Sequence, residues 1–91
     1  MAIWNELDNT IFSTGYGVAW NGTLWVAVGE GTNTIAYSSN GIDWDGIRSE
    51  DSLFGSSGTG NGIAWNGTLW VAVGTGTNTI IYSYDRIDWF P

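Results

Sequence analysis

The sequence predicts an all-β fold of two similar antiparallel units, and three observations point to it. Fourteen glycines and one proline separate short runs of β-branched and aromatic residues, a composition typical of short strands joined by tight turns. The stretch AWNGTLWVAVG occurs twice, at residues 19–29 and 64–74, each time around an Asn-Gly pair. The repeat extends beyond this stretch, because residues 17–44 align with 62–89 without a gap and differ at only 6 of 28 positions.

The period of the repeat is 45 residues. Repeats of about 40–50 residues that each supply four strands are typical of β-propeller blades. We therefore predict two four-stranded antiparallel blades in a single two-blade unit over residues 1–91. Repeat 1 spans 16–47, a polar, glycine-rich crossover loop spans 48–60, and repeat 2 spans 61–91. The adjacent apolar pair Leu53-Phe54 is expected to tuck under this loop.

Each unit opens with a hairpin. Asn-Gly is the strongest short hairpin signal, because both central positions of a type I′ turn need a positive φ. In repeat 1 it predicts paired strands at 16–20 and 23–28, with Trp20 opposite Thr23. Both faces of this hairpin are apolar, with Val18, Trp20, Trp25 and Ala27 on one and Ala19, Leu24, Val26 and Val28 on the other. We therefore expect the sheet to be covered on both sides.

The second half of each unit holds a third strand, expected at 34–38 and 79–83, and a fourth strand that begins near Trp44 and Trp89. The turn between them reads SSNGIDW in repeat 1 and SYDRIDW in repeat 2. Arg86 replaces a glycine in this turn, and we expect the replacement to change the turn type, because a positive φ suits glycine better than other residues.

A further copy of the fourth strand is expected at the start of the chain. The segment AIWNEL resembles IDWDGI, with Trp4 in the place of Trp44. We predict that residues 1–7 form an outer strand that closes a blade begun elsewhere in a ring.

Two blades alone would leave two apolar faces without a neighbour, and arrays of such repeats need about three units to be stable. The chain has no cysteine and no histidine, which excludes disulfide bridges and His/Cys zinc sites as stabilising links. We therefore predict that several copies of the chain complete one closed propeller ring, a cyclic homo-oligomer. Three chains with six blades are the first choice. Four or five chains remain open, because the sequence does not determine the angle between blades.

The residues expected to build and assemble the blades are the tryptophans, the two Asn-Gly turns and the turn before the fourth strand. They are Trp4, Trp20, Trp25, Trp44, Trp65, Trp70, Trp89, Asn21, Gly22, Asn66, Gly67, Ser38, Asn40, Gly41, Ser83 and Asp85. We expect the tryptophans to pack between blades, because aromatic side chains bury large apolar areas.

The turn YSSNGIDW resembles the Asp-box hairpin of sialidase-like β-propellers, which has a Ser, then Asp or Asn, a Gly, and a Trp on the next strand. Ser38, Asn40, Gly41 and Trp44 stand in those roles, with a spacing to the Trp that is one residue shorter. The repeats are also similar to those of uncharacterised propeller proteins of large DNA viruses and phages. A repeat this regular in so short a chain resembles an excised or engineered fragment. The Asp box is a structural motif, so the resemblance implies a fold and no activity.

An enzyme is not expected. A sialidase-type site needs three clustered arginines, whereas the chain has only Arg48 and Arg86, at non-equivalent places. No cofactor and no metal ion are predicted. A formal net charge of −7 repels phosphate and anionic lipid, so nucleic acid and membrane surfaces are not expected as partners. The apolar runs are far shorter than the roughly 20 residues of a membrane span, and no targeting segment is visible.

The alternative function is a multivalent lectin-like module that binds carbohydrate, because exposed aromatic rings stack on sugar faces and a ring would repeat them. Loops on a rigid scaffold are the expected place for recognition. The residues that would line such a site are Glu30, Thr32, Asn33, Ser39, Thr75, Thr77, Asn78 and Tyr84. The two Asn-Gly-Thr triplets also match the N-glycosylation pattern, but their role as hairpin turns explains them fully.

Overall fold

The computed structural model describes residues 11–48 and 52–91 of the chain. Residues 1–10 and 49–51 lie outside these ranges. The predicted N-terminal outer strand, with Trp4, therefore falls outside the described residues, as does part of the predicted crossover loop.

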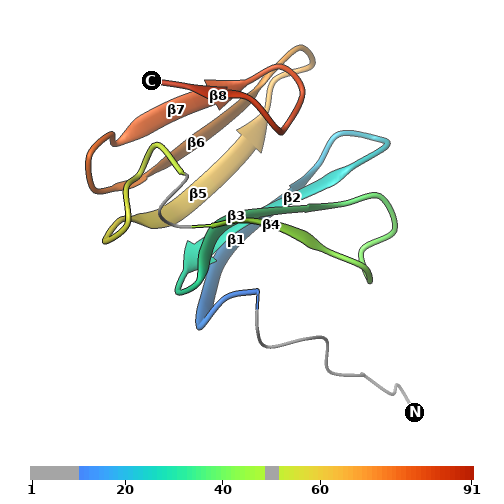
Figure 1. Cartoon of the computed structure of the whole chain (residues 1–91). Helices are drawn as coiled ribbons and strands as arrows, with labels where there is room; N and C mark the ends of the chain where they lie inside the picture. The colour runs from blue at the N-terminus through green and yellow to red at the C-terminus, as the bar shows by residue number, and fades with distance from the viewer. Residues whose placement is uncertain (1–10, 49–51) are drawn as a thin grey trace.

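Strands in the described residues form two four-stranded antiparallel sheets, and the strand order in each follows the chain (Figure 1). Sheet 1 contains β1 (Thr14–Trp20), β2 (Trp25–Glu30), β3 (Asn33–Ser38) and β4 (Asp45–Arg48). Sheet 2 contains β5 (Thr59–Trp65), β6 (Trp70–Thr75), β7 (Ile80–Ser83) and β8 (Trp89–Phe90). No helix occurs in these parts of the chain. The prediction of an all-β chain with two blade-like antiparallel sheets is confirmed.

The register of the first hairpin differs from the prediction. Trp20 pairs with Trp25 instead of Thr23, so the second strand begins two residues later than expected. The shift is an even number of residues, and side chains alternate between faces with a period of two. Val18, which pairs with Ala27, therefore stays on the predicted face beside the two tryptophans.

The cause of the shift lies in the Asn21 side chain. Its carboxamide oxygen accepts hydrogen bonds from the backbone N–H groups of Thr23 and Leu24, at 2.9 and 2.8 Å. The Asn66 carboxamide does the same in the second hairpin. Only the glycine of each Asn-Gly pair has a positive φ, 101° at Gly22, so the predicted type I′ turn is wrong. An asparagine side chain that bonds the following backbone replaces it.

Each sheet has two faces, which we name after residues on β2 and β6. The Trp face carries Trp25 in sheet 1 and Trp70 in sheet 2, and the Val face carries Val28 in sheet 1 and Val73 in sheet 2. The cross-strand pairs of each sheet define the rest of these faces. The remaining members of the Trp faces are Val18, Trp20, Ala27 and Ala36 in sheet 1 and Ile63, Trp65, Ala72 and Ile81 in sheet 2. The remaining members of the Val faces are Val26, Ile35 and Tyr37 in sheet 1 and Val71, Ile80 and Tyr82 in sheet 2.

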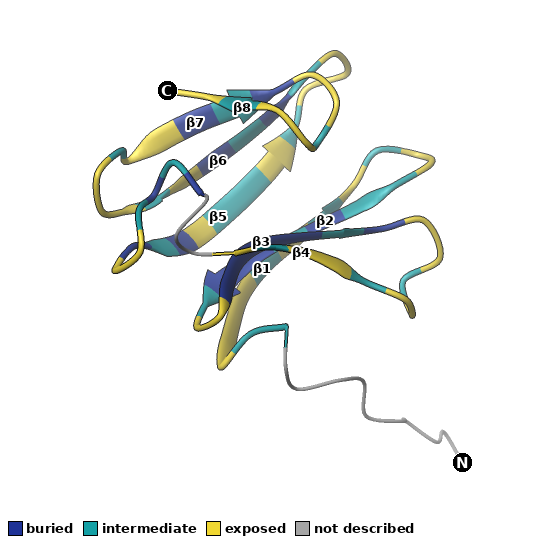
Figure 2. Ribbon diagram, viewed as in Figure 1, coloured by how far each residue is buried: buried dark blue, intermediate teal, exposed yellow. Residues whose placement is uncertain are grey.

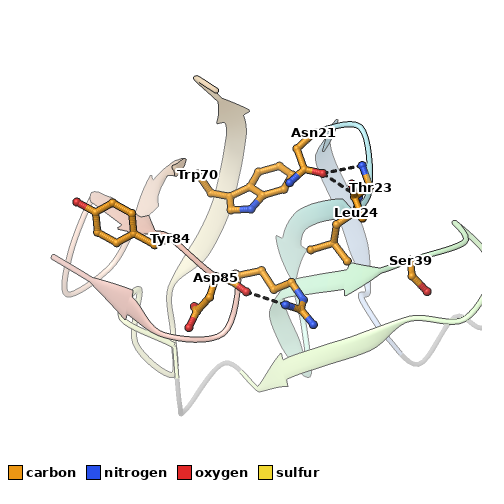
Figure 3. Close-up of a pocket in the computed structure, with 8 residues that line it drawn as sticks. Asn21, Thr23, Leu24, Ser39, Trp70, Tyr84 and Asp85 are labelled. Carbon is orange, nitrogen blue, oxygen red and sulfur yellow. Dashed lines mark hydrogen bonds between the residues drawn. The ribbon is translucent and has the colours of Figure 1, made fainter. Parts of the chain in front are cut away.

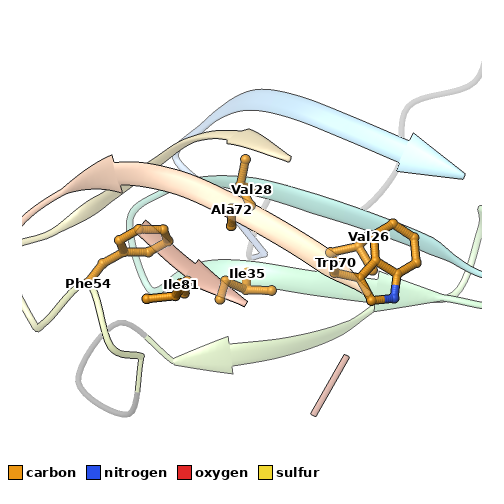
Figure 4. Close-up of a cluster of buried hydrophobic side chains, with 7 residues drawn as sticks. All are labelled: Val26, Val28, Ile35, Phe54, Trp70, Ala72 and Ile81. Carbon is orange, nitrogen blue, oxygen red and sulfur yellow. The ribbon is translucent and has the colours of Figure 1, made fainter. Parts of the chain in front are cut away.

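The core lies between the two sheets, where the Val face of sheet 1 meets the Trp face of sheet 2 (Figures 2 and 4). Its buried members are Val26, Val28, Ile35, Phe54, Trp70, Ala72 and Ile81. Unlike faces are therefore in contact, so the two sheets stack in the same orientation.

Glycines on the inner strands let the sheets approach closely. A Cβ atom on Gly17 of β1 would lie 3.6 Å from the Gly62 Cα of β5. A Cβ atom on Gly60 would lie 2.7 Å from the Val28 Cβ, which is closer than real side chains allow. The glycine-rich start of β5 is thus required for the contact between sheets.

The connection between the sheets is anchored by the apolar pair Leu53-Phe54, which packs under it as the sequence predicts. Phe54 is fully buried in the core, and Leu53 is half-buried against it. The Asn78 side-chain amide donates a hydrogen bond to the Leu53 carbonyl at 2.7 Å. Asn33 makes the same kind of bond to the Ile11 carbonyl, at 2.9 Å, ahead of sheet 1.

Two tryptophan pairs mark the ends of the first hairpins. The ring centroids of Trp20 and Trp25 lie 4.9 Å apart, and those of Trp65 and Trp70 lie 5.0 Å apart. The pairs sit on equivalent positions but in different surroundings. Trp70 is only 1% exposed in the core, whereas its equivalent Trp25 is half-buried. Trp20 is 45% exposed on the outer Trp face, whereas its equivalent Trp65 is half-buried.

Candidate functional site

The turn before the fourth strand is built around one serine. In sheet 1 the Ser38 hydroxyl oxygen accepts hydrogen bonds from the backbone N–H groups of Asn40 and Gly41, at 3.2 and 2.8 Å. The Asn40 carboxamide oxygen in turn accepts hydrogen bonds from the backbone N–H groups of Ile42 and Asp43. The Trp44 indole N–H donates to the Gly41 carbonyl at 3.1 Å. Side chains, rather than a backbone ladder, hold this turn.

The turn of sheet 2 repeats this geometry, so the expected change of turn type is wrong. Ser83 accepts from the backbone N–H groups of Asp85 and Arg86, at 3.2 and 2.8 Å, and the Trp89 indole donates to the Arg86 carbonyl at 3.0 Å. Arg86 adopts a φ of 70°, close to the 78° of Gly41. The hydrogen bonds to Ser83 and to the Asp85 carboxylate hold Arg86 in a backbone conformation that costs about 1–2 kcal/mol for residues other than glycine.

The Asp85 carboxylate is part of the same network. Backbone N–H groups of Asp88 and Ile87 donate to one of its oxygens, at 2.8 and 2.9 Å, and lower its pKa from 3.8 to about 2. Hydrogen bonding to Asp85, and the charge of that carboxylate, raise the pKa of the Asp88 carboxyl. Asp85 is therefore charged at neutral pH and acts as the acceptor that shapes the turn.

Arg86 reaches from this turn across to sheet 1. Its guanidinium carbon lies 5.1 Å from the centroid of the Tyr37 ring, within cation–π distance. One of its terminal N–H groups donates to the Asp85 carbonyl at 3.0 Å. Its Nε is buried without a hydrogen-bond partner. The arginine thus links the two sheets through an aromatic ring.

A pocket of about 340 Å³ opens beside this arginine (Figure 3). It lies between the first-hairpin loop of sheet 1 and the Arg86 turn of sheet 2, and its lining residues are Asn21, Thr23, Leu24, Ser39, Trp70, Tyr84, Asp85 and Arg86. Its volume falls in the range of small-molecule sites, and its walls combine apolar and hydrogen-bonding groups. Both sheets are needed to form it.

The candidate loop residues are divided between two ends of the sheets. Ser39 and Tyr84 line the pocket. The others lie at the opposite end, in or next to the β2–β3 and β6–β7 turns: Glu30, Thr32, Asn33, Thr75, Thr77 and Asn78. Asn33 and Asn78 are engaged as the backbone anchors described above. The Tyr16 hydroxyl donates to the Glu30 carboxylate at 3.1 Å, and this bond raises the tyrosine pKa.

The tryptophans also differ in their surroundings. Trp70 lies in the core, and Trp65 and Trp89 are half-buried against it. Trp25 and Trp44 are half-buried in sheet 1. These positions agree with a packing role for most of them.

Sequence reasoning did not single out Arg86 with Tyr37, or the pocket role of Asn21. One signal was present: Arg86 replaces Gly41 in an otherwise similar turn, which is a costly exchange at a positive φ. Such an exchange between repeats indicates that the Arg86 side chain makes a contact that has no counterpart at the equivalent turn of sheet 1.

Within residues 11–48 and 52–91, no group of three or more acidic, histidine or cysteine side chains is placed to hold a metal ion. The same residues include no helix long and apolar enough to cross a membrane. No protein-family model matches the chain, and comparisons with curated proteins and with solved structures also find no match.

Proposed function

We propose that this chain is a non-enzymatic β-propeller fragment that assembles with copies of itself into a closed ring, with three chains and six blades as the first choice. The observation that carries the proposal is a match of surfaces. The two outer faces of the chain are the repeat equivalents of the two faces that already contact each other inside it.

The inner contact joins the Val face of sheet 1 to the Trp face of sheet 2, where Ile35 is fully buried. Its repeat equivalent on the outer Val face, Ile80, is 61% exposed. On the outer Trp face, Val18 is 55% exposed and lies beside the exposed Trp20. A second copy could place its outer Val face on this outer Trp face and so repeat the inner contact.

Burial favours this arrangement. Fully burying a side chain of this size contributes about 1.5–3 kcal/mol. Covering the half-exposed Val18, Trp20, Val73 and Ile80 would contribute on the order of 5 kcal/mol per junction before the cost of association is subtracted. That amount is comparable with the lower end of the stability of a whole domain.

The two outer faces are unlike, so the contact is head-to-tail, and such contacts give either rings or open filaments. A ring covers every apolar face, whereas a filament leaves one exposed at each end. The side-chain network of the Ser38 and Ser83 turns supports the resemblance to Asp-box propellers.

The test relies on the contact between copies being head-to-tail, so that each copy contributes a different face to each of its two contacts. Trp20→Asp places a charge on the outer Trp face, and Ile80→Asp places one on the outer Val face. We expect the wild-type chain to form one oligomer of defined mass in native mass spectrometry and light scattering. Each variant alone should be monomeric, because one of the two faces it needs is changed.

An equimolar mixture of the two variants should form a one-to-one dimer, because each supplies the face that the other lacks. Circular dichroism must show that both variants remain folded. A wild-type chain that stays a folded monomer at high concentration, or variants that do not complement each other, would contradict the proposal.

The pocket supports a second candidate, a lectin-like role in which each chain binds one carbohydrate. The pocket is lined by the polar residues Asn21, Ser39 and Asp85 together with apolar residues such as Trp70. Sugars are bound by this combination of hydrogen bonds and apolar contact.

Asn21 and Asn66 form a matched pair for this test, because they hold equivalent turns and only Asn21 lines the pocket. In a titration of simple sugars followed by tryptophan fluorescence, Asn21→Ala should weaken binding about fivefold, the effect of one hydrogen bond. Asn66→Ala should leave it unchanged. A flat response of the wild type to every sugar would remove this candidate.

A further inference from the structure

A cluster of three aromatic rings lies on the outer Val face of sheet 2. The centroid of the Tyr82 ring is 6.0 Å from that of Tyr84, with the two planes at 87°, and 5.5 Å from that of Phe90. Tyr84 is 62% exposed and Phe90 is 44% exposed. The Tyr84 ring points away from the side chains of Trp70 and Asp85 (Figure 3). The cluster is thus open to solvent in the single chain.

The equivalent tyrosine of repeat 1 shows which kind of group can pack on such a ring. Tyr37 is the equivalent of Tyr82, and both face outward from the Val face of their sheet. Tyr37 is covered by a guanidinium group, that of Arg86. The corresponding position of the other repeat is Gly41, which has no side chain that could cover an aromatic ring.

The surroundings of the two tyrosines also differ. Asp45 lies opposite Tyr37 on the neighbouring strand, whereas Phe90 lies opposite Tyr82. Tyr84 replaces Ser39 in the following turn. At this position sheet 2 therefore has three aromatic rings, whereas sheet 1 has Tyr37 alone.

Electrostatics favour a cation at this place. Each ring carries negative partial charge on its face, and several rings together form the cages that recognise organic cations. The chain has a formal net charge of −7, which attracts cations and repels anions.

We propose that Tyr82, Tyr84 and Phe90 form a binding site for the guanidinium group of a small molecule, in the way that Tyr37 holds Arg86. The site does not depend on the proposed ring, because all three rings belong to one chain. Within a ring, the turn at Gly41 of the next copy would face the site, and a glycine there leaves room for the ligand.

The test compares two ligands that differ only in charge. N-acetyl-arginine amide carries a guanidinium group, and N-acetyl-citrulline amide carries a neutral urea group of the same shape. Each is titrated into the chain while the ring resonances of Tyr82, Tyr84 and Phe90 are followed by NMR. We expect saturable shifts with the arginine compound and none with the citrulline compound.

The first variant takes its residue from the other repeat, where Ser39 occupies the equivalent position. Tyr84→Ser should weaken binding of the arginine compound about two- to fivefold, the effect of one cation–π contact. Tyr16→Phe, a change at an exposed ring on sheet 1, is the control and should leave binding unchanged. Phe90→Leu, which removes the π face but keeps an apolar side chain, provides a second variant if Tyr84→Ser does not fold. Equal shifts with both ligands, or unchanged binding in both cluster variants, would overturn the proposal.

Discussion

The Arg86 guanidinium lies over the Tyr37 ring, 5.1 Å from its centroid, although the backbone of Arg86 has a φ of 70°. A side chain of sheet 2 thus covers an aromatic ring of sheet 1 from a position that favours glycine. The strained backbone lowers stability and the cation–π contact raises it. Substitutions of Arg86 can separate the two contributions.

Arg86→Ala removes the cation–π contact but keeps a Cβ at the positive φ. Arg86→Gly removes the same contact and also relieves the backbone. We expect the glycine variant to be more stable than the alanine variant by about 1 kcal/mol in urea denaturation. The alanine variant should be less stable than the wild type by about 0.5–1 kcal/mol. Equal stabilities of the two variants would show that the arginine backbone is not strained.

The asparagine of each first hairpin should contribute to stability through its side-chain oxygen. Asn21→Ala leaves the backbone N–H groups of Thr23 and Leu24 without that acceptor, and we expect a loss of about 1–2 kcal/mol in the free energy of unfolding. Asn21→Asp keeps an acceptor and should retain most of the stability. Asn66→Ala should cost a similar amount, because the two turns have the same hydrogen bonds.

The Asp85 turn predicts two separate carboxyl titrations. Hydrogen bonds from the Asp88 and Ile87 N–H groups lower the pKa of Asp85 to about 2, while Asp85 raises the pKa of Asp88 above 3.8. NMR titration of the two carboxyl groups should show this order. In Asp85→Asn the Asp88 pKa should move back down towards 3.8, because the hydrogen bond with the Asp85 carboxylate and its charge are both removed.

The same shift has a consequence for acid stability. The pKa of Asp85 is lower in the folded chain than in the unfolded chain. Its stabilising contribution is therefore fully present above pH 3.8 and is lost as the pH falls through about 2. Asp85→Asn keeps an oxygen acceptor, as Asn40 does in sheet 1, and has no such titration. Its stability should depend less steeply on pH in this range, and an unchanged slope would contradict the assignment.

Two glycines of sheet 2 should respond differently to alanine. A Cβ atom on Gly74 would collide with the Thr59 carbonyl oxygen and lie 2.9 Å from the Phe54 ring. We expect Gly74→Ala to lower stability by at least the 1–3 kcal/mol typical of overpacking. Gly67 has open space around it and a φ of 99°, so Gly67→Ala should cost about 1 kcal/mol from backbone strain alone. Chemical denaturation measures the free energy of unfolding of both variants, and the larger loss is expected for Gly74→Ala.

The strand content and the division of each hairpin into faces were predictable, because both depend on local alternation and turn residues. The register was not. A side chain such as that of Asn21 can take the hydrogen bonds that the backbone makes in a type I′ turn, and the Asn-Gly letters are the same in both cases. Trp20 and Ala27 kept their predicted faces only because the shift was even.

The site was harder to foresee than the fold. The pocket joins Asn21 to Arg86, which are distant in the chain and meet only because the two sheets stack. The turn of Arg86 was mispredicted because backbone preference was considered without the hydrogen bonds of Ser83. The candidate residues around Glu30 and Thr75 could not share a site with Ser39, since successive turns of an antiparallel sheet lie at opposite ends.

The paired indoles of the two hairpins have an optical consequence. Two chromophores held 4.9 or 5.0 Å apart, with their planes at 39° and 52°, share their excited states. Each sheet should therefore contribute an exciton couplet to the circular dichroism of the folded chain. Trp65→Phe would remove the couplet of sheet 2 and Trp20→Phe that of sheet 1. The chain thus carries a separate spectroscopic reporter of folding in each half, without any added label.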